Sequence, residues 1–415
     1  MNAYRDLVQV FGRIGFLSFG GPAAQIALMH QELVEKRDWL SEEQYLRALS
    51  FCMLLPGPEA MQLATYAGWK QRGLIGGLIG GGLFVLPGAC VIMVLALLYG
   101  IYGNLPIVQA LFLGVKATVV IIVIQALLKV AKRALISAKT RMIAVFAFLA
   151  LFIFALPFPL VIAIAAVAGG YGAVAQEGPA ASVPLQWQRS LLILVVGCMI
   201  WAAPLLLIQD AHPILTDIAT FFARLAVVTF GGAYAVLAYM TQAVVGEFGW
   251  LTTPQMMDAL GLAETTPGPL ILVTQFVGMV AGAETGGTRL ALAAGAVTLW
   301  VTFVPCFIWI FAGAPLIDWL ADQPRPKAAL AGITAAVVGV IANLSVWFAM
   351  HVFFGTVQPF RAGPVQISVP QLASIDLIAI GLAVFAGTLL LWRKVNLINV
   401  LAISVALSGA IAVIT

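Results

Sequence analysis

Charged and titratable residues are scarce in this sequence of 415 residues. Only 9% of the residues are Asp, Glu, Lys or Arg, against about 25% in soluble domains. The four cysteines are scattered, without the CxxC spacing of a metal or redox site. Signatures of phosphate-binding loops, zinc hydrolases, serine hydrolases and Rossmann sites are also missing. The sequence therefore predicts neither an enzyme nor a nucleic-acid binder, and it gives no reason to expect a cofactor or a metal.

Apolar residues dominate instead, at 62% of the chain, with a mean hydropathy of +1.05. Many lie in runs long enough for helices to cross an apolar layer of about 30 Å. The polar start, Met1 to Asp6, is not followed by a signal-peptide pattern. The sequence predicts an all-α polytopic membrane protein. The expected spanning helices are 74–100, 105–130, 141–156, 159–175, 190–208, 290–315, 327–353, 374–392 and 396–414.

Two further apolar regions, 4–71 and 214–283, are broken by glycine and proline. Their helical pieces, such as 42–54 and 59–71, are short for a full crossing. In transporters, short interrupted segments at corresponding places in two halves mark the binding site. These two regions are therefore the candidate site.

The two regions are also copies of each other. With a shift of 211 positions, residues 13–58 align with 224–269 without a gap and share 17 identities in 46 positions. The motif FGG at 19–21 falls on 230–232, and PGP at 56–58 falls on 267–269. At a shift of 218 the match resumes, with Pro87 over Pro305. The expected domains are an N-terminal repeat 1–175, a linker and connecting helix 176–208, and a C-terminal repeat 209–415.

The positions of Lys and Arg predict the orientation. Loops 131–141 and 318–328 and the pair Arg393-Lys394 should be cytoplasmic, because positive loops stay inside. An odd number of crossings then separates the two broken regions, so the repeats should be inverted. We expect 42–71 and 253–283 to be re-entrant hairpins reached from opposite faces. The alternative is that each PGP motif only kinks a longer helix.

Three cations lie inside apolar segments, where each costs roughly 2.5–3.5 kcal/mol. Arg13 and Arg224 occupy equivalent places before the FGG motifs, and Lys116 lies within 105–130. They could snorkel to an interface or pair with a carboxylate. Helices that begin after Gly21, Pro58 and their repeat partners would also direct free N–H groups into the membrane. Together these groups favour a compact oxyanion, although the carbonyl ends of broken helices bind cations in other transporters.

Two carboxylates flank the PGP motifs. Glu59 follows the first motif, and Glu264 precedes the second. Each could couple a proton to anion movement or serve as the counter-ion of an arginine, and Glu59 could simply stabilise its helix N-terminus. The candidate substrate-binding residues are Arg13, Ser18, Gly20, Gly21, Pro22, Gln25, Pro56, Gly57, Pro58, Lys116, Arg224, Thr229, Gly231, Gly232, Thr265, Thr266, Pro267, Gly268 and Pro269.

These motifs resemble those of the chromate ion transporter family, in its long form with two homologous halves. The residues that carry the resemblance are FGGPAAQIA at 19–27, WL at 39–40 and PGP at 56–58, with FGG, WL and PGP again at 230–232, 250–251 and 267–269. The resemblance covers nearly the whole chain. Gln25 departs from the histidine that is common at its position in the family.

The resemblance implies a transporter of the bacterial plasma membrane that exports chromate. The expected driving force is the proton motive force or exchange with another anion such as sulfate. Sulfate or another oxyanion is the alternative substrate, and a passive channel, a cation exporter and a membrane-embedded enzyme are the competing classes. Lipid is the expected surrounding. The glycine-rich segment 76–82 could pack helices within one chain or between two, so a homodimer is one expected arrangement.

Overall fold

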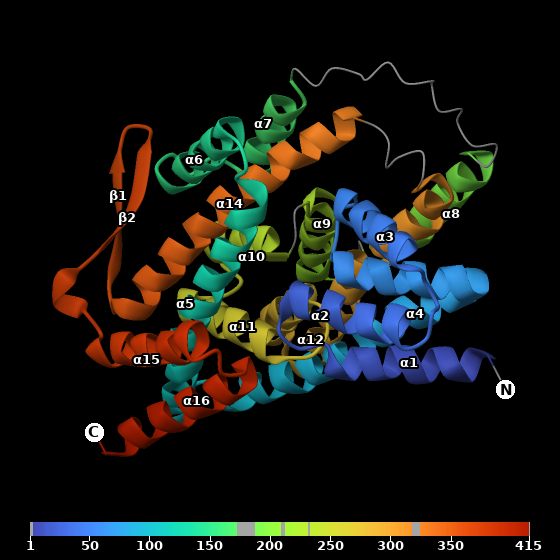
Figure 1. The fold of residues 1–415 in the computed structure, drawn as a ribbon. Coiled ribbons are helices and arrows are strands. Elements are labelled where there is room, and N and C mark those ends of the chain that lie inside the picture. Colours follow the sequence, from blue (N-terminus) through green and yellow to red (C-terminus); the bar gives the residue numbers. More distant parts are fainter. Residues whose placement is uncertain (1–2, 172–186, 209–211, 231–232, 318–323, 415) are drawn as a thin grey trace. The chain divides into compact units, whose positions relative to one another are not determined.

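The computed structural model describes residues 3–171, 187–208, 212–230, 233–317 and 324–414, which are mostly helical (Figure 1). The first half of the chain contains α1 (Ala3–Leu17), α2 (Gly21–His30), α3 (Glu42–Leu54), α4 (Glu59–Tyr102), α5 (Pro106–Ala134), α6 (Ala138–Phe152), α7 (Phe158–Gly170) and α8 (Trp187–Ile208). The second half contains α9 (Pro213–Val228), α10 (Ala233–Thr241), α11 (Thr253–Thr265), α12 (Val273–Gly313), α14 (Pro324–Phe353), α15 (Leu377–Gly387) and α16 (Leu397–Ile414).

The sequence repeat is also a repeat of secondary structure. The π-helix η1 (Gln31–Glu35) in the first copy corresponds to η2 (Gln242–Glu247) in the second. The helix α3 begins after Ser41, which accepts a hydrogen bond from the backbone N–H of Gln44 in a capping box. Thr252 and Gln255 make the corresponding bonds before α11. Equivalent sequence signals therefore begin equivalent helices.

The long helices α4 and α12 are each two helices joined at a break. In α4 the backbone leaves the helical region at Arg72 and Gly73, and in α12 it does so at Gly286 and Gly287. Gly73 and Gly287 have φ of 59° and 70°, a conformation that suits glycine. The piece 59–71 predicted from the sequence is therefore confirmed as a separate helix.

Glycines let the two parts of α4 lie against each other. A Cβ on Gly68 would meet the carbonyl of Gly76, and one on Gly80 would lie 2.5 Å from the carbonyl of Ala64. Gly76 contacts Gly68, and the later residue Gly80 contacts the earlier residue Ala64, so the two parts run antiparallel. Gly278 and Gly282 allow the same approach to the second part of α12. Backbones this close are the packing mode of small residues in membranes.

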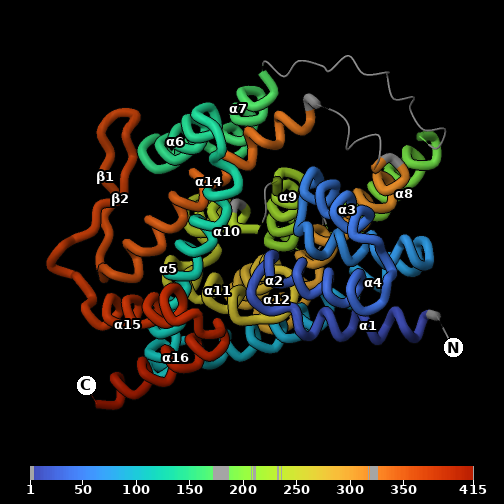
Figure 2. The backbone as a smooth tube through the Cα atoms, viewed as in Figure 1, coloured from blue at the N-terminus to red at the C-terminus, as the bar shows by residue number. Residues whose placement is uncertain are grey.

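The described helices form two compact units, and each collects segments from both halves of the sequence. Unit 1 comprises Met1–Gly100, Val174–Val236 and Thr266–Lys327, and unit 2 comprises Ile101–Ala173, Leu237–Thr265 and Ala328–Thr415. Both FGG motifs and both PGP motifs belong to unit 1. The boundaries predicted above divide the chain by repeat and remain a prediction. The path of the chain through α1, α2, α3 and α4 can be followed in Figure 2.

Six of the described helical segments are long and apolar enough to cross a membrane. They lie in α4, α5, α8, the segment from η3 (Leu270–Leu272) through α12, α14 and α16. Three predicted spans are shorter than expected, because α6 ends at Phe152, α7 at Gly170, and α15 begins only at Leu377. Pro157 separates α6 from α7, and η6 (Thr388–Trp392) extends α15 as a π-helix.

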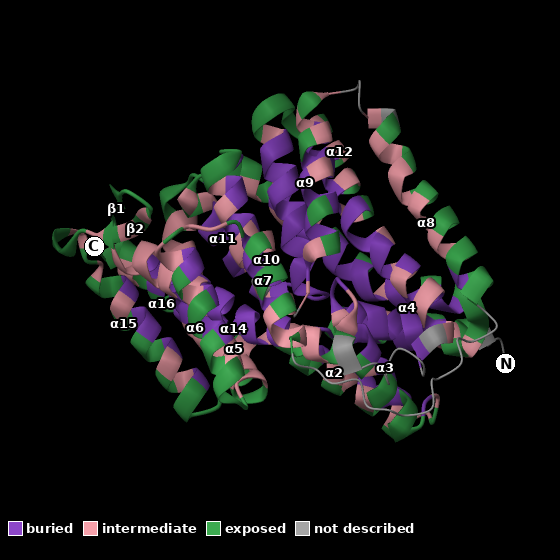
Figure 3. Ribbon diagram, turned by 90° about the horizontal axis from the view of Figure 1, so that it is seen from above, coloured by how far each residue is buried: buried purple, intermediate pink, exposed green. Residues whose placement is uncertain are grey.

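Burial differs strongly among the helices of unit 1. In Figure 3, α9 and α12 show mostly buried surface, whereas α8 shows mostly exposed and intermediate residues. Only 6% of the apolar stretch of α8 is buried, although this helix packs against α12. Its exposed residues include Leu191, Leu192 and Met199. An apolar face of this kind suits contact with lipid tails.

One element was not predicted. The segment between α14 and α15 contains an antiparallel hairpin of β1 (Val357–Ala362) and β2 (Val365–Pro370), which turns at Gly363 with a φ of 59°. Val365, Ile367 and Val369 alternate with polar residues, which is a strand pattern. The N–H of Gln366 donates to the carbonyl of Ile153 at 2.7 Å, which attaches the hairpin to the end of α6 in unit 2.

Candidate anion site at the helix breaks

The first FGG motif is a sharp break between α1 and α2. Gly20 and Gly21 both have positive φ, 84° and 76°, so glycine is required at both positions. No side chain caps the N-terminus of α2, and Pro22 occupies its first turn. Ser18, just before the break, is fully buried and donates its hydroxyl to the carbonyl of Ile14 at 2.5 Å. The first turn of α2 therefore presents N–H groups without a side-chain acceptor.

The two PGP motifs are buried loops that precede helices. Gly57 and Gly268 have φ of 115° and 87°. A Cβ on Gly57 would lie 2.8 Å from Cys306 Sγ, and one on Gly268 would lie 3.0 Å from Leu272 Cδ1. The backbone conformation therefore requires glycine at the centre of each motif, and at Gly57 the nearby Cys306 also leaves little space.

Each PGP motif is bonded to the residue that precedes the other repeat's FGG motif. The N–H of Gly268 donates to the carbonyl of Ser18 at 2.9 Å, and the N–H of Gly57 donates to the carbonyl of Thr229 at 2.8 Å. Ser18 and Thr229 are equivalent positions, as are Gly57 and Gly268. The residues that precede the two FGG motifs are thus bonded to the two PGP motifs in two reciprocal pairs within unit 1. This exchange brings together the motifs that the sequence predicted to form one site.

Two buried glutamines complete these loops. Gln25 Nε2 donates to the carbonyl of Gly268 at 2.7 Å and to that of Ser18 at 3.3 Å. Gln62 Nε2 donates to the carbonyl of Pro56 at 2.7 Å. Gln25 was predicted as a site residue, and Gln62 was not in the candidate set. Their amides satisfy backbone carbonyls that the breaks leave without a helical partner.

The structure describes the second FGG motif only up to its first residue, Phe230. Thr229 is buried, ends α9 and donates its hydroxyl to the carbonyl of Leu225. Gly231 and Gly232, both predicted site residues, lie outside the described residues. Tyr234, just beyond them, places its hydroxyl 3.8 Å from where a Cβ of Gly21 would be. A residue of the second repeat therefore approaches the first FGG break.

The two predicted arginines lie on exposed faces of unit 1. The side chain of Arg13 is 57% exposed, and its Nη1 lies 4.0 Å from Glu32 Oε1. Glu32 is almost fully buried and also binds Lys36 and Arg37. Arg224 is exposed and lines an apolar groove of about 450 Å³ with Trp201 and Leu205 of α8. Neither contact joins an arginine to a PGP loop, so their role at the anion site stays a prediction.

The predicted acidic and threonine residues divide between the units. Glu59 is the first residue of α4 in unit 1 and is partly exposed, and Thr266 is buried in the same unit. Glu264 and Thr265 end α11 in unit 2. Glu264 is buried, and Thr265 donates its hydroxyl to the carbonyl of Leu262 at 2.9 Å. Their proposed parts in coupling and binding stay predictions.

Lys116 has a carboxylate partner that the sequence analysis missed. Its Nζ lies 2.8 Å from Oδ1 of Asp258, and both side chains are buried within unit 2. Asp258 lies in α11, which packs against α5 next to Lys116, with Val115 touching Gly261. The sequence signal that could have indicated this partner is an acidic residue, Asp258, within the apolar run 256–260. The pairing itself could not be foreseen, since the two residues are far apart in the chain.

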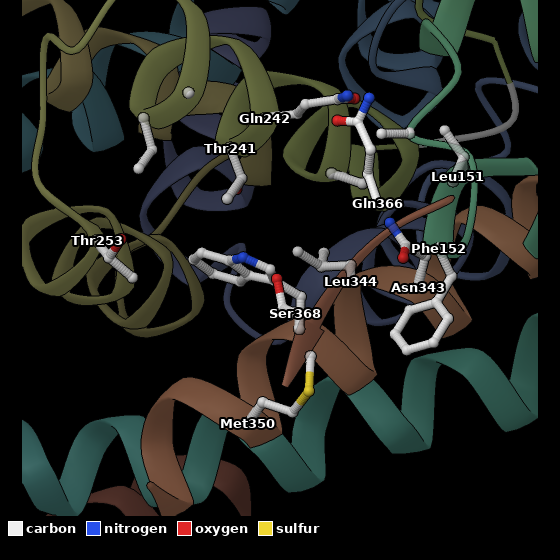
Figure 4. A pocket seen from close by; sticks show the side chains of 15 residues that line it. Leu151, Phe152, Thr241, Gln242, Thr253, Asn343, Leu344, Met350, Gln366 and Ser368 are labelled. Carbon is white, nitrogen blue, oxygen red and sulfur yellow. The ribbon is translucent and has the colours of Figure 1, made fainter. Parts of the chain in front are cut away.

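Unit 2 also contains a cavity of about 270 Å³ between α6, α10, η2, α14 and β2. Figure 4 shows Gln242, Asn343, Gln366 and Ser368 around it, together with apolar residues such as Leu344. None of its lining residues carries a formal charge. A cavity of this kind can hold water or a small polar solute, but it offers no cation to a dianion.

The sequence matches the chromate transporter family over residues 5–170 and 216–412, which include both FGG and both PGP motifs. The chain belongs to the chromate transporter family. It is 31% identical to the chromate transport protein of Cupriavidus metallidurans over 82% of this chain and 81% of that protein. It is 28% identical to the chromate transport protein of Pseudomonas aeruginosa over 97% of this chain and 91% of that protein. No solved structure matches the chain.

The chromate transporter family is a family of transport proteins and not of enzymes, as the sequence predicted. The chain is a multi-pass membrane protein, and its relatives together with its six apolar helices indicate the bacterial plasma membrane. Family membership supports chromate transport and an anionic substrate. The resemblance noted from the motifs is therefore confirmed.

Proposed function

We propose that this protein is a secondary active transporter that exports chromate across the plasma membrane. The sequence has no nucleotide-binding motif, so transport must run on an ion gradient or on the membrane potential. A potential that is negative inside drives anions outward by about 2.3 kcal/mol per charge per 100 mV. The proton motive force, or exchange with another anion such as sulfate, would supply the coupling.

One observation carries the location of the site: the reciprocal hydrogen bonds between Ser18 and Gly268 and between Thr229 and Gly57. They gather two broken regions that lie far apart in the sequence. The N-terminus of α2 at Gly21 and that of α4 at Glu59 would supply N–H groups and the positive ends of helix dipoles. Such groups bind the oxygens of a tetrahedral oxyanion.

The remaining candidate residues would act on this site through charge. Arg13 and Arg224 would raise the local potential from their exposed positions, and the effect of each would be modest because of solvent screening. Glu59 or Glu264 would carry the coupled proton or act as a counter-ion. Lys116 would contribute only when Asp258 does not hold its charge.

Inverted repeats give this site a route for alternating access. The two copies would enter the membrane from opposite faces, with 42–71 and 253–283 as re-entrant hairpins. Rocking of one bundle against the other would then expose the breaks first to the cytoplasm and then to the outside. The repeated order of π-helices, caps and breaks supports two structurally equivalent copies.

The test is transport by the purified full chain in proteoliposomes, with labelled chromate and with labelled sulfate. We expect saturable chromate movement that responds to an imposed pH gradient or to anion on the opposite side. Gly57→Ala and Gly268→Ala should each abolish it, since both glycines have a positive φ that strains a residue with a side chain. Gly82→Ala is the matched control, because a Cβ there meets nothing within 4 Å.

Other outcomes would point elsewhere. Chromate conductance without saturation or exchange would indicate a passive channel. Sulfate movement without chromate movement would reassign the substrate. Wild-type rates in both the Gly57→Ala and the Gly268→Ala variants, together with unchanged affinity in Arg13→Ala and Arg224→Ala, would remove the site from the helix breaks.

A further inference from the structure

A buried glutamine amide lies at each PGP motif, and its orientation is fixed. Gln25 is 1% exposed and Gln62 is fully buried. The nitrogen of each amide faces backbone carbonyls, those of Gly268 and Ser18 for Gln25 and that of Pro56 for Gln62. Only the nitrogen of an amide can donate to a carbonyl, so the oxygen of each amide must point the other way.

The oxygen of each amide is a buried acceptor without a hydrogen-bond partner among the described residues. Leaving such a group unpaired costs about 1–3 kcal/mol. Both glutamines belong to the first repeat, and Val236 stands at the position equivalent to Gln25. Each PGP motif therefore obtains its buried acceptor from a different place in the repeat, on α2 in one case and on α4 in the other.

Gln25 lies on α2, the helix that begins at the first FGG break, and its amide reaches back to that break. The same amide bonds to Ser18, three residues before the uncapped N-terminus of α2 at Gly21. The break therefore combines N–H groups, which bind anionic oxygens, with one oxygen that can only accept a proton-bearing group. A fully deprotonated oxyanion has no hydrogen to give, and it would be repelled by that oxygen.

We propose that the site binds its oxyanion in the singly protonated form, whose hydroxyl group donates to Gln25 Oε1, with Gln62 Oε1 as the corresponding acceptor at the other break. The inference rests on the proposed function and adds the protonation state of the substrate. Hydrogen chromate and chromate interconvert near neutral pH, whereas hydrogen sulfate is a much stronger acid and is essentially absent there. The amide acceptor that receives this one proton thus selects chromate against sulfate.

Two measurable consequences follow. Above the dissociation of hydrogen chromate, its concentration falls about tenfold for each pH unit, so KM in total chromate should rise about tenfold per unit. Below that dissociation KM should become independent of pH. The transported species would also carry one negative charge instead of two. The membrane potential would therefore exert half the driving force on its movement.

Protein groups that titrate must be separated from the substrate. The elements in contact with α2 include α1, η1 and α3, and Tyr45 of α3 donates its hydroxyl to the carbonyl of Ile26. Tyr234 of α10 lies near Gly21, and Cys306 of α12 lies near Gly57. His30 is the group of this set that ordinarily titrates near neutral pH. The ionisable groups on these elements and next to the PGP motifs are Tyr4, Arg5, Asp6, Arg13, His30, Glu32, Glu35, Glu42, Glu43, Tyr45, Arg47, Cys52, Glu59, Tyr234, Glu264 and Cys306.

The experiment measures chromate counterflow in proteoliposomes of the full chain, with equal pH on both sides, over the range that spans hydrogen chromate dissociation. Phosphate, which carries a hydroxyl group throughout this range, and sulfate, which does not, are the competitors. We expect KM to track hydrogen chromate, and phosphate to compete at least tenfold better than sulfate. His30→Gln should keep the same profile, which excludes titration of that side chain.

Gln25→Met removes the acceptor and should reduce both the pH slope and the preference for phosphate over sulfate. Gln71→Met is the matched control, since Gln71 donates to the carbonyl of Trp39 at 2.8 Å, outside the breaks. If Gln25→Met does not fold, the wild-type profile alone decides. A KM that is constant in total chromate, or sulfate competing as well as phosphate, overturns the inference and leaves chromate transport standing. Absence of any chromate movement overturns the proposed function as well.

Discussion

The ammonium group of Lys116 lies 2.8 Å from a carboxylate oxygen of Asp258, and both side chains are buried. The pair joins α5 to α11 within unit 2. A lysine inside an apolar helix is costly, and a carboxylate at this distance removes most of that cost. The pair therefore accounts for a cation that the sequence analysis counted among the candidate substrate-binding residues.

Neutralising one partner of this pair should destabilise the protein. Asp258→Asn leaves the ammonium group of Lys116 buried without its counter-charge, and we expect a loss of about 3–5 kcal/mol. The double variant Lys116→Met, Asp258→Leu should recover most of it. The measurement is unfolding in detergent by denaturant or by heat.

The exposed pair of Glu43 and Arg47 is the control for this prediction, with side chains 73% and 56% exposed and 2.6 Å between the charged atoms. Glu43→Gln should cost at most about 1 kcal/mol. Equal losses for Asp258→Asn and Glu43→Gln would contradict the interpretation of Lys116 and Asp258 as a buried, mutually dependent pair.

Adjacent glycines in α4 should respond in opposite ways to alanine. A Cβ on Gly81 would meet Thr65 Oγ1 and would lie 2.6 Å from Phe307, whereas one on Gly82 meets nothing within 4 Å. Gly81→Ala should therefore cost about 1–3 kcal/mol through overpacking. Gly82→Ala should gain up to about 1 kcal/mol from helix propensity. Melting temperatures in one detergent provide the comparison, and a similar shift for both variants would contradict the close packing of the two parts of α4.

His30, at the end of α2, forms a cluster with two glutamates that should make stability depend on pH. Nε2 of His30 lies 2.7 Å from Glu42 Oε2, and Nδ1 lies 3.1 Å from Glu35 Oε1. The hydrogen bond to Glu42 raises the pKa of His30 above its usual value, against a smaller opposing effect of burial. Because the folded pKa is raised, the stabilisation is fully present below the unfolded value of about 6.5 and is lost as pH rises through the folded value.

The melting temperature should therefore fall as pH rises above about 6.5, through this cluster. His30→Gln should remove that part of the fall, and Glu42→Gln should reduce it. Glu43→Gln changes the neighbouring carboxylate, which pairs with Arg47, and should leave the profile unchanged. A His30→Gln profile that still falls as steeply as the wild type would show that another group titrates.

Much of the architecture could be predicted because it follows from local patterns. Glycine and proline at the FGG and PGP motifs predicted the breaks, and the repeat predicted that they occur in equivalent pairs. The hairpin of β1 and β2 was not predicted, because its strand pattern is short and lies between helices. The break near Pro157 lies between the predicted spans 141–156 and 159–175, but α6 already ends at Phe152, and Ala155 has a positive φ of 46° that no local pattern indicated.

The contacts of the site could not be predicted, because they join distant parts of the chain. A shift of 211 aligns Ser18 with Thr229, yet the hydrogen bonds connect Ser18 to Gly268 and Thr229 to Gly57. An alignment reports which residues are equivalent and not which residues touch. The same limit hid Asp258 from Lys116, which are 142 positions apart.

The bond between Gln25 and Gly268 joins residues 243 positions apart, and this separation has a consequence for biosynthesis. At about 5–20 residues per second, a ribosome needs roughly 12–50 s to make that stretch of chain. Throughout this interval the break between α1 and α2 has already been synthesised, while the backbone groups that complete it do not yet exist. The nascent protein should therefore depend on an insertase or chaperone that shelters its first broken region until the second emerges, and chains that terminate before Gly268 should be recognised as incomplete and degraded.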